Sequence, residues 1–117
     1  MASLSDVRAL TISDENAAST TRIAAAARPT AAFTLANTTH ANGTARNVTV
    51  TTTGTGDNGK TVTVVGTDVF GDSLTEVITS TGSAETVAGT SLFLTVASAT
   101  CSAQYAANVS VGSGSVC

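Results

Sequence analysis

Aromatic and charged residues are scarce in this chain. Only 3% of the 117 residues are aromatic, none is Trp, and 11% are charged, with five Lys and Arg against eight Asp and Glu. Five scattered cations form no basic patch for phosphate groups, so we expect no nucleic-acid partner. No apolar run approaches the roughly 20 residues of a membrane-spanning helix, so we expect no membrane partner either.

The beginning of the chain lacks the pattern of a secretory signal. Asp6, Asp14 and Glu15 interrupt its apolar residues, and no basic segment precedes them. We therefore expect synthesis in a cytoplasm. The same stretch shows no sustained helix or strand periodicity, which predicts an irregular N-terminal arm.

Cysteine and histidine are also rare. Cys101 and Cys117 are the two cysteines, and His40 is the single histidine. The thiols are both reduced, or bridged within the chain, or Cys117 is bonded to a neighbouring subunit. Two thiols and one distant imidazole do not supply the four ligands of a zinc site. No G-x-S-x-G elbow or comparable nucleophile occurs, so we predict no enzyme activity, no cofactor and no small-molecule substrate.

The aspartates of two Gly-containing turns have the oxygen ligands that calcium prefers. Asp57 lies in GTGDNG, and Asp68 and Asp72 lie in DVFGDS. Neither segment matches the D-x-[DN]-x-[DN]-G pattern of a calcium loop. Asp and Asn bond their own backbone in turns, and Gly permits positive φ, so turn chemistry explains these residues without a metal.

Thr is abundant, at about a fifth of the residues. Such β-branched side chains suit the pleated surface of a strand and lose χ1 freedom in a helix. Much of the 42% hydrophobic content is Ala, which contributes little transfer free energy when buried. The sequence therefore predicts a single β-rich domain with a thin core that gains further burial from partners.

The segment 46–80 holds three strand-like runs, RNVTVTTT, KTVTVVGT and LTEVITS, separated by Gly-rich turns. This pattern predicts a β-meander with hairpin connections. In the first two runs Val alternates with Thr, which predicts one buried and one wet face. In the third run Glu76 shares a side with Leu74 and Ile78, so it lies near a strand edge or at a subunit contact. Phe70, at a turn, is either a plug over the end of the domain or an exposed anchor for another subunit.

The remaining strand signals are weaker. Residues 21–24 and 32–36 could be strands, with at most a turn or two of helix in the Ala run before Pro29. The run SLFLTVASATC is apolar on both sides and is predicted to be the central strand, and Val109 and Val111 mark the last one. We expect an all-β fold, a single antiparallel β-sandwich or small barrel-like domain of about six or seven short strands.

These elements divide the chain into three parts. We expect an N-terminal arm over residues 1–19, a β-domain over residues 20–112 and a flexible tail over residues 113–117.

From about residue 17 to residue 112, the succession TVTVVGTD, GDSLTE, TSLFLTVAS and AANVSVGSG resembles small β-rich virion structural proteins of tailed bacteriophages. Leu94 stands where that family commonly has Lys, and Ala107 where it commonly has Gly, and neither change breaks a strand. The resemblance implies a capsid decoration, or cement, protein that binds the outer surface of the assembled head. Such proteins tie neighbouring major capsid proteins together, commonly as trimers.

The resemblance also implies which residues make contacts. The partner would be the major capsid protein, the location the capsid surface of the virion, and the protein a homo-oligomer, with a trimer favoured. A tail, head-completion or fibre module of the virion is the alternative, and a carbohydrate-binding module would require exposed aromatic platforms. Residues of the arm expected at the capsid are Asp6, Val7, Arg8, Leu10, Asp14 and Glu15. Residues expected between subunits are Phe70, Glu76 and Cys117.

Overall fold

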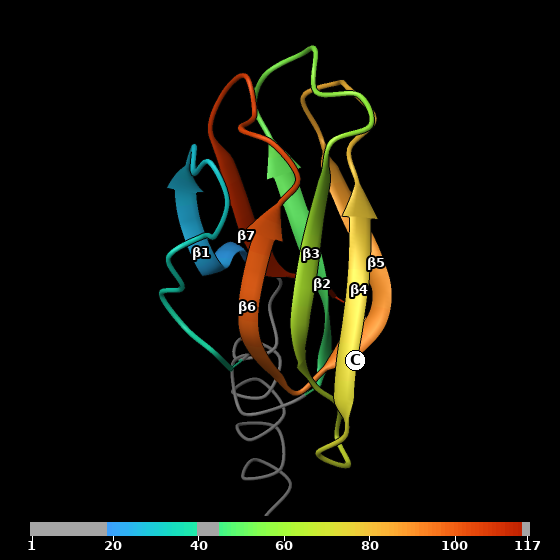
Figure 1. The fold of residues 1–117 in the computed structure, drawn as a ribbon. Coiled ribbons are helices and arrows are strands. Elements are labelled where there is room, and N and C mark those ends of the chain that lie inside the picture. Colours follow the sequence, from blue (N-terminus) through green and yellow to red (C-terminus); the bar gives the residue numbers. More distant parts are fainter. Residues whose placement is uncertain (1–18, 40–44, 116–117) are drawn as a thin grey trace, which may run out of the picture.

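Two antiparallel β-sheets stack face to face in the structure, a computed structural model that describes residues 19–39 and 45–115 (Figure 1). Within these residues there is no helix and no closed barrel, which confirms the predicted all-β fold in its sandwich form. The strands are β1 (Ser19–Ala27), β2 (Arg46–Thr52), β3 (Thr61–Thr67), β4 (Ser73–Thr79), β5 (Thr86–Phe93), β6 (Thr95–Cys101) and β7 (Val109–Ser113). Apart from Ser19, the predicted arm lies outside the described residues.

The two sheets differ in size and in strand order. The larger has the order β1-β7-β2-β5 and the smaller the order β4-β3-β6. β3 and β4 form the predicted hairpin, in unbroken register from the pair Thr61 and Thr79 to the pair Thr67 and Ser73. The connections β2–β3, β4–β5, β5–β6 and β6–β7 all carry the chain from one sheet to the other, so the two sheets are linked repeatedly by the chain.

Valine dominates the core because alternate residues of each strand face the space between the sheets. Phe33 is buried and Leu35 packs against the same cluster, which confirms that these two residues share one face. Only a few large side chains join them, so the core is as thin as the composition predicts. The buried apolar residues are Ile23, Ala24, Phe33, Val48, Val50, Val62, Val64, Ile78, Phe93, Val96, Ala99, Cys101, Tyr105, Val109 and Val111.

The predicted meander is wrong at its first connection. β2 and β3 lie in different sheets, and residues 53–60 pass over one end of the sandwich between them. Alternation of Val and Thr shows which face of a strand is buried but not which strand lies beside it, so facing sheets satisfy the pattern as well as a hairpin does. The predicted wet face of β2 is also covered, since Asn47 and Thr49 are buried and the backbone of Gly114 lies against the Asn47 side chain.

The run SLFLTVASATC is not a central strand, as the sequence predicts, but two edge strands. β5 ends at Phe93 at the edge of the larger sheet, and β6 begins at Thr95 at the edge of the smaller one. Leu94 is the crossing point, and its N–H donates to the carbonyl of Thr67. Because the chain changes sheets there, Phe93 and Val96 both face the core, and the run therefore looks apolar on both sides.

The Ala run before Pro29 forms the second half of β1 rather than a helical turn. The chain then returns along the open side of the sandwich. Ala36 donates to the carbonyl of Ile23 in β1, whereas Phe33 donates to the carbonyl of Ala99 in β6. Residues 31–39 therefore join an edge of each sheet, although 32–36 form only an isolated bridge and not the predicted strand.

The last strand extends further than the sequence predicts. Ser113 belongs to β7 opposite Val48, and the N–H of Gly114 donates to the carbonyl of Asn47. The predicted flexible tail from residue 113 is therefore wrong at its first two residues. The sequence missed them because Gly and Ser are typical of linkers, whereas here they fit where neighbouring backbone comes close.

Candidate interaction surface

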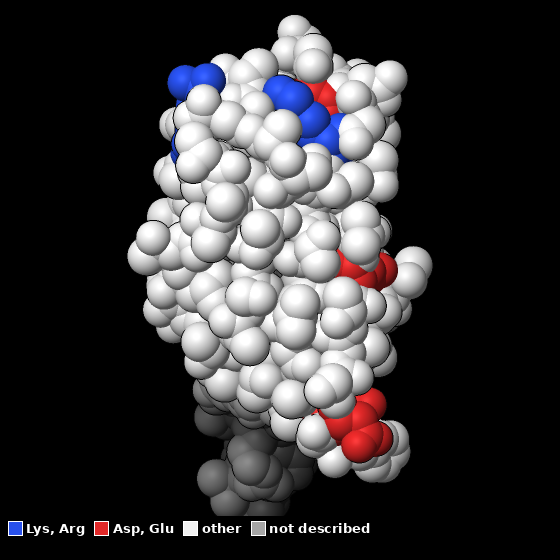
Figure 2. All heavy atoms as spheres, in the orientation of Figure 1, with Lys and Arg blue, Asp and Glu red and all other residues white. Residues whose placement is uncertain are grey.

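The outer face of the smaller sheet is uncharged over its whole middle. Directly opposed residues form rows across it, such as Thr63 between Val77 and Thr100 and Val65 between Thr75 and Ser98. Figure 2 shows cationic side chains, with acidic atoms beside them, at one end of the molecule, and acidic side chains at the other end and along one edge, with no charge across the middle of this face. We call this set the threonine face: Thr61, Thr63, Val65, Thr67, Thr75, Val77, Thr79, Thr95, Ser98 and Thr100.

The threonine face combines wettable hydroxyls with exposed methyl groups. Val77, in the edge strand β4, is 56% exposed, and the Thr residues of β4 on either side of it are exposed too. Thr67 and Thr95 share a hydroxyl hydrogen bond of 2.6 Å across the sheet, which fixes their side chains. Protein interfaces are depleted of Lys, Glu and Asp at their centres, and this face shares that low charge.

The β3–β4 hairpin ends in a rigid tip that presents an aromatic ring. One carboxylate oxygen of Asp68 accepts hydrogen bonds from the N–H groups of Phe70 and Asp72, at 2.9 and 3.0 Å. Gly71 has a φ of 83°, which suits glycine, and its N–H donates to the carbonyl of Asp68. Phe70 is 85% exposed, so the plug alternative is wrong and the anchor alternative stays a prediction.

Glu76 connects the edges of the two sheets on the side away from β1. Its carboxylate accepts hydrogen bonds from the N–H of Thr90 at 2.7 Å, from the Thr90 hydroxyl at 3.1 Å and from the N–H of Ser91 at 3.3 Å. These donors lie on the outer edge of β5, which has no strand beyond it. Of the two alternatives for Glu76, the position near a strand edge is the one observed, and whether it also meets another subunit remains a proposal.

A polar cluster holds the loops together at the opposite end from the hairpin tip. Asp57 is only 1% exposed, and its carboxylate accepts from the ammonium of Lys60 and from the N–H of Ala106, both at 2.8 Å. The buried Tyr105 hydroxyl shares a 2.9 Å hydrogen bond with the Ser80 hydroxyl, and the Lys60 ammonium lies 5.7 Å from the ring centre. Asp57 therefore holds two loops together, whereas the sequence predicts only that it shapes its own turn.

The ionisation of this cluster makes stability depend on pH. The hydrogen bond from Lys60 foremost, with a smaller contribution from Ala106, holds the pKa of Asp57 below its ordinary value of 3.8, although burial opposes the shift. Burial raises the pKa of Tyr105. Because the Asp57 pKa is lower in the folded chain, its contribution to stability is complete above 3.8 and is lost as the pH falls toward the folded value.

We therefore expect Asp57→Asn to be less stable than the wild type at pH 7, and the difference to shrink as the pH is lowered from 5 to 2. Urea unfolding midpoints across this range measure the difference directly. The stability of Lys60→Gln should also depend less on pH than that of the wild type, because the substitution removes the main cause of the lowered Asp57 pKa. A gap between wild type and Asp57→Asn that stays constant down to pH 2 would contradict this role of Asp57.

Several residues singled out in the sequence fall outside the described part of the chain. These are the six arm residues Asp6, Val7, Arg8, Leu10, Asp14 and Glu15, together with His40 and Cys117. Their predicted roles stay predictions.

Cys101 is a buried free thiol whose sulfur lies 3.1 Å from the carbonyl oxygen of Ala31. Cys117 lies outside the described residues, so the alternatives for the two thiols stay predictions.

The described residues bring together no three His, Cys, Asp or Glu side chains around a common point that could hold a metal ion. Residues 19–39 and 45–115 also include no helix of the length and apolarity that crossing a membrane requires. Comparison with known protein families, with curated proteins and with solved structures finds no match to this chain.

Proposed function

We propose that this protein is a non-enzymatic structural component of a bacteriophage virion, a decoration protein that binds the outer surface of the assembled head. It would stabilise contacts between major capsid proteins, and its threonine face would lie against them. The observation that carries this proposal is the uncharged threonine face, a three-stranded surface with exposed methyl groups and no ionic side chain across its centre. Such a surface can be buried against protein without desolvating a charge.

The architecture supports a role in which neighbours complete the stability of the subunit. Valine is the commonest residue of the core, which contains only a few larger side chains. Binding that occurs only in the folded state adds to stability by mass action, so a thin-cored subunit gains much from a lattice of contacts. The N-terminal arm, residues 1–19, belongs to this proposal as a second contact with the shell, through its mixture of apolar and charged side chains.

Placing a cation on the threonine face should weaken decoration. We expect Val77→Lys to reduce the affinity for purified heads by at least about tenfold, because burying an unpaired ammonium costs more than an interface contact returns. Co-sedimentation of the full chain with heads that lack the protein measures the bound fraction. Val77 is exposed and lies on an edge strand, so the variant should unfold at the same urea concentration as the wild type.

Ala88→Lys is the matched control. Ala88 is an exposed residue of the edge strand β5 in the other sheet, and the same charge there should leave binding unchanged. Equal binding by Val77→Lys and wild type would show that the threonine face does not meet the shell. Binding to tails but not to heads would instead support the alternative, that the protein is a tail component of the virion.

A further inference from the structure

The hairpin tip is an apolar anchor with acidic neighbours. Val69 and Phe70 are both more than half exposed; Asp68 directly precedes them, and Asp72 follows after Gly71. The hydrogen bonds that Asp68 accepts from the tip backbone hold the loop in one shape, so the ring is presented at little further entropic cost. An exposed Phe on a preorganised loop is the kind of residue that dominates binding energy once it enters a pocket.

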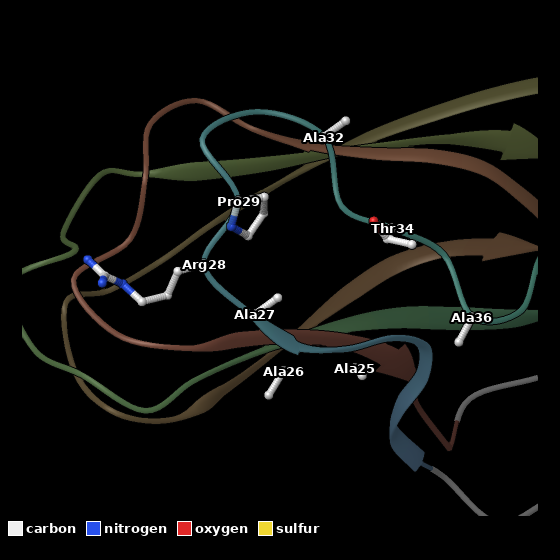
Figure 3. Close-up of a pocket in the computed structure, with 8 residues that line it drawn as sticks. All are labelled: Ala25, Ala26, Ala27, Arg28, Pro29, Ala32, Thr34 and Ala36. Atoms are coloured by element: carbon white, nitrogen blue, oxygen red, sulfur yellow. The ribbon is translucent and has the colours of Figure 1, made fainter.

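A shallow apolar groove lies on the opposite flank of the molecule, where the chain turns back beside β1. Its volume is about 470 Å³. Most of its surface consists of alanine methyl groups and the ring of Pro29, and Figure 3 shows the Arg28 side chain extending away from them at one end. The lining residues are Ala25, Ala26, Ala27, Arg28, Pro29, Ala32, Thr34 and Ala36.

One end of this groove carries positive charge. Arg28 lines that end, where its Nε donates to the carbonyl of Tyr105 at 3.0 Å. No carboxylate lines the groove. The groove is therefore apolar beside a cation, and the tip is apolar between two anions.

We propose that the tip of one copy of this chain inserts into the groove of a second copy, with Phe70 and Val69 on the alanine surface and a tip carboxylate near Arg28. The tip closes the β3–β4 hairpin in the smaller sheet, whereas the groove lies along β1, at the far edge of the larger sheet. One chain cannot bring them together without refolding, so a contact between tip and groove requires a second copy. Complementary charge also suppresses the wrong pairings, tip to tip and groove to groove.

This contact joins two different surfaces, so it is heterologous. After the first contact the pair retains one free tip, on one copy, and one free groove, on the other, so the assembly grows until a rotation closes it into a ring. The contact uses neither Val77 nor the middle of the threonine face, and it forms without a capsid. Its failure and the failure of the proposed shell binding are therefore distinguishable.

Sedimentation of the full chain in reducing buffer tests the contact, because the reductant prevents any linkage through Cys117. We expect a concentration-dependent oligomer for the wild type. Phe70→Ala should raise the dissociation constant at least about thirtyfold, as for a central interface residue. Ala32→Trp, which fills the groove, should have a comparable effect, and combining the two changes should add little because both remove one contact. Circular dichroism shows that each variant remains folded.

A charge exchange identifies the pairing. Arg28→Glu alone and Asp72→Lys alone should each weaken association about three- to tenfold, and the double variant should recover most of the loss. Asp72 suits this test because its side chain, unlike that of Asp68, is not used to shape the tip. A wild type that stays monomeric at millimolar concentration would overturn the proposal. So would an oligomer indifferent to Phe70→Ala or to Ala32→Trp, or a double variant no better than its single changes.

Discussion

Replacing Phe93 with Ala should lower the free energy of unfolding by about 3–5 kcal/mol, the range for a fully buried Phe. Phe93 has 0% exposure at the end of β5, directly before the chain crosses to the other sheet. The loss combines the transfer free energy of the ring with the cavity left behind, and the alanines and valines around it are too short to fill that space. Urea unfolding of the full chain, followed by circular dichroism, measures the change.

Phe70→Ala is the matched control for this prediction. It removes the same ring from a position that is 85% exposed, so its stability should stay within about 0.5 kcal/mol of the wild type. The comparison is made at low protein concentration, where self-association does not add to stability. Similar losses for the two variants would contradict the assignment of Phe93 to the core and Phe70 to the surface.

Gly66→Ala should be the second most damaging change, with a loss of about 3 kcal/mol or more. A Cβ atom on Gly66 would lie 1.9 Å from the carbonyl oxygen of Thr95, a backbone atom that cannot rotate away. The close approach exists because the pairing of β3 with β6 shifts at this point, from Val65 opposite Ser98 to Gly66 opposite Val96. β3 is the central strand of its sheet, so any displacement disturbs both neighbours.

Ala88→Val provides the comparison for Gly66→Ala, because it enlarges an exposed strand residue that has solvent in front of it. Its effect on the urea midpoint should be small, since a β-branched side chain suits an exposed strand position. If Gly66→Ala unfolds at the same urea concentration as Ala88→Val, then β3 and β6 are not held as closely as the structure shows.

Local pattern was sufficient to locate most strands, because alternation and turn residues are properties of short segments. The Val positions of β2 and β3, the β3–β4 hairpin and the shared face of Phe33 and Leu35 all follow from spacing alone. Pairing between strands was harder to predict. The valines of β2 can be buried by a facing sheet or by a sheet neighbour, and nothing within the run distinguishes the two.

The candidate interaction surface could be predicted only in part for a similar reason. Phe70 was recognisable as an unusual residue for a turn, and the structure excludes its alternative role as a plug. The role of Glu76 depends on β5 lying across from it, and the role of Asp57 depends on the loop that carries Ala106, both distant in sequence. When the hydrogen-bond partner of a side chain is distant in sequence, the residues next to that side chain in the sequence do not indicate its role.

The Glu76 carboxylate, which covers part of the outer edge of β5, affects how molecules of this protein behave at high concentration. Unpaired N–H groups at the edge of a sheet are templates on which strands of other molecules add, the first step toward fibrils. Glu76 occupies two of these donors and places a negative charge where an incoming strand would have to lie. Many copies can therefore be held at short distances with less risk that neighbouring molecules merge their sheets through this edge.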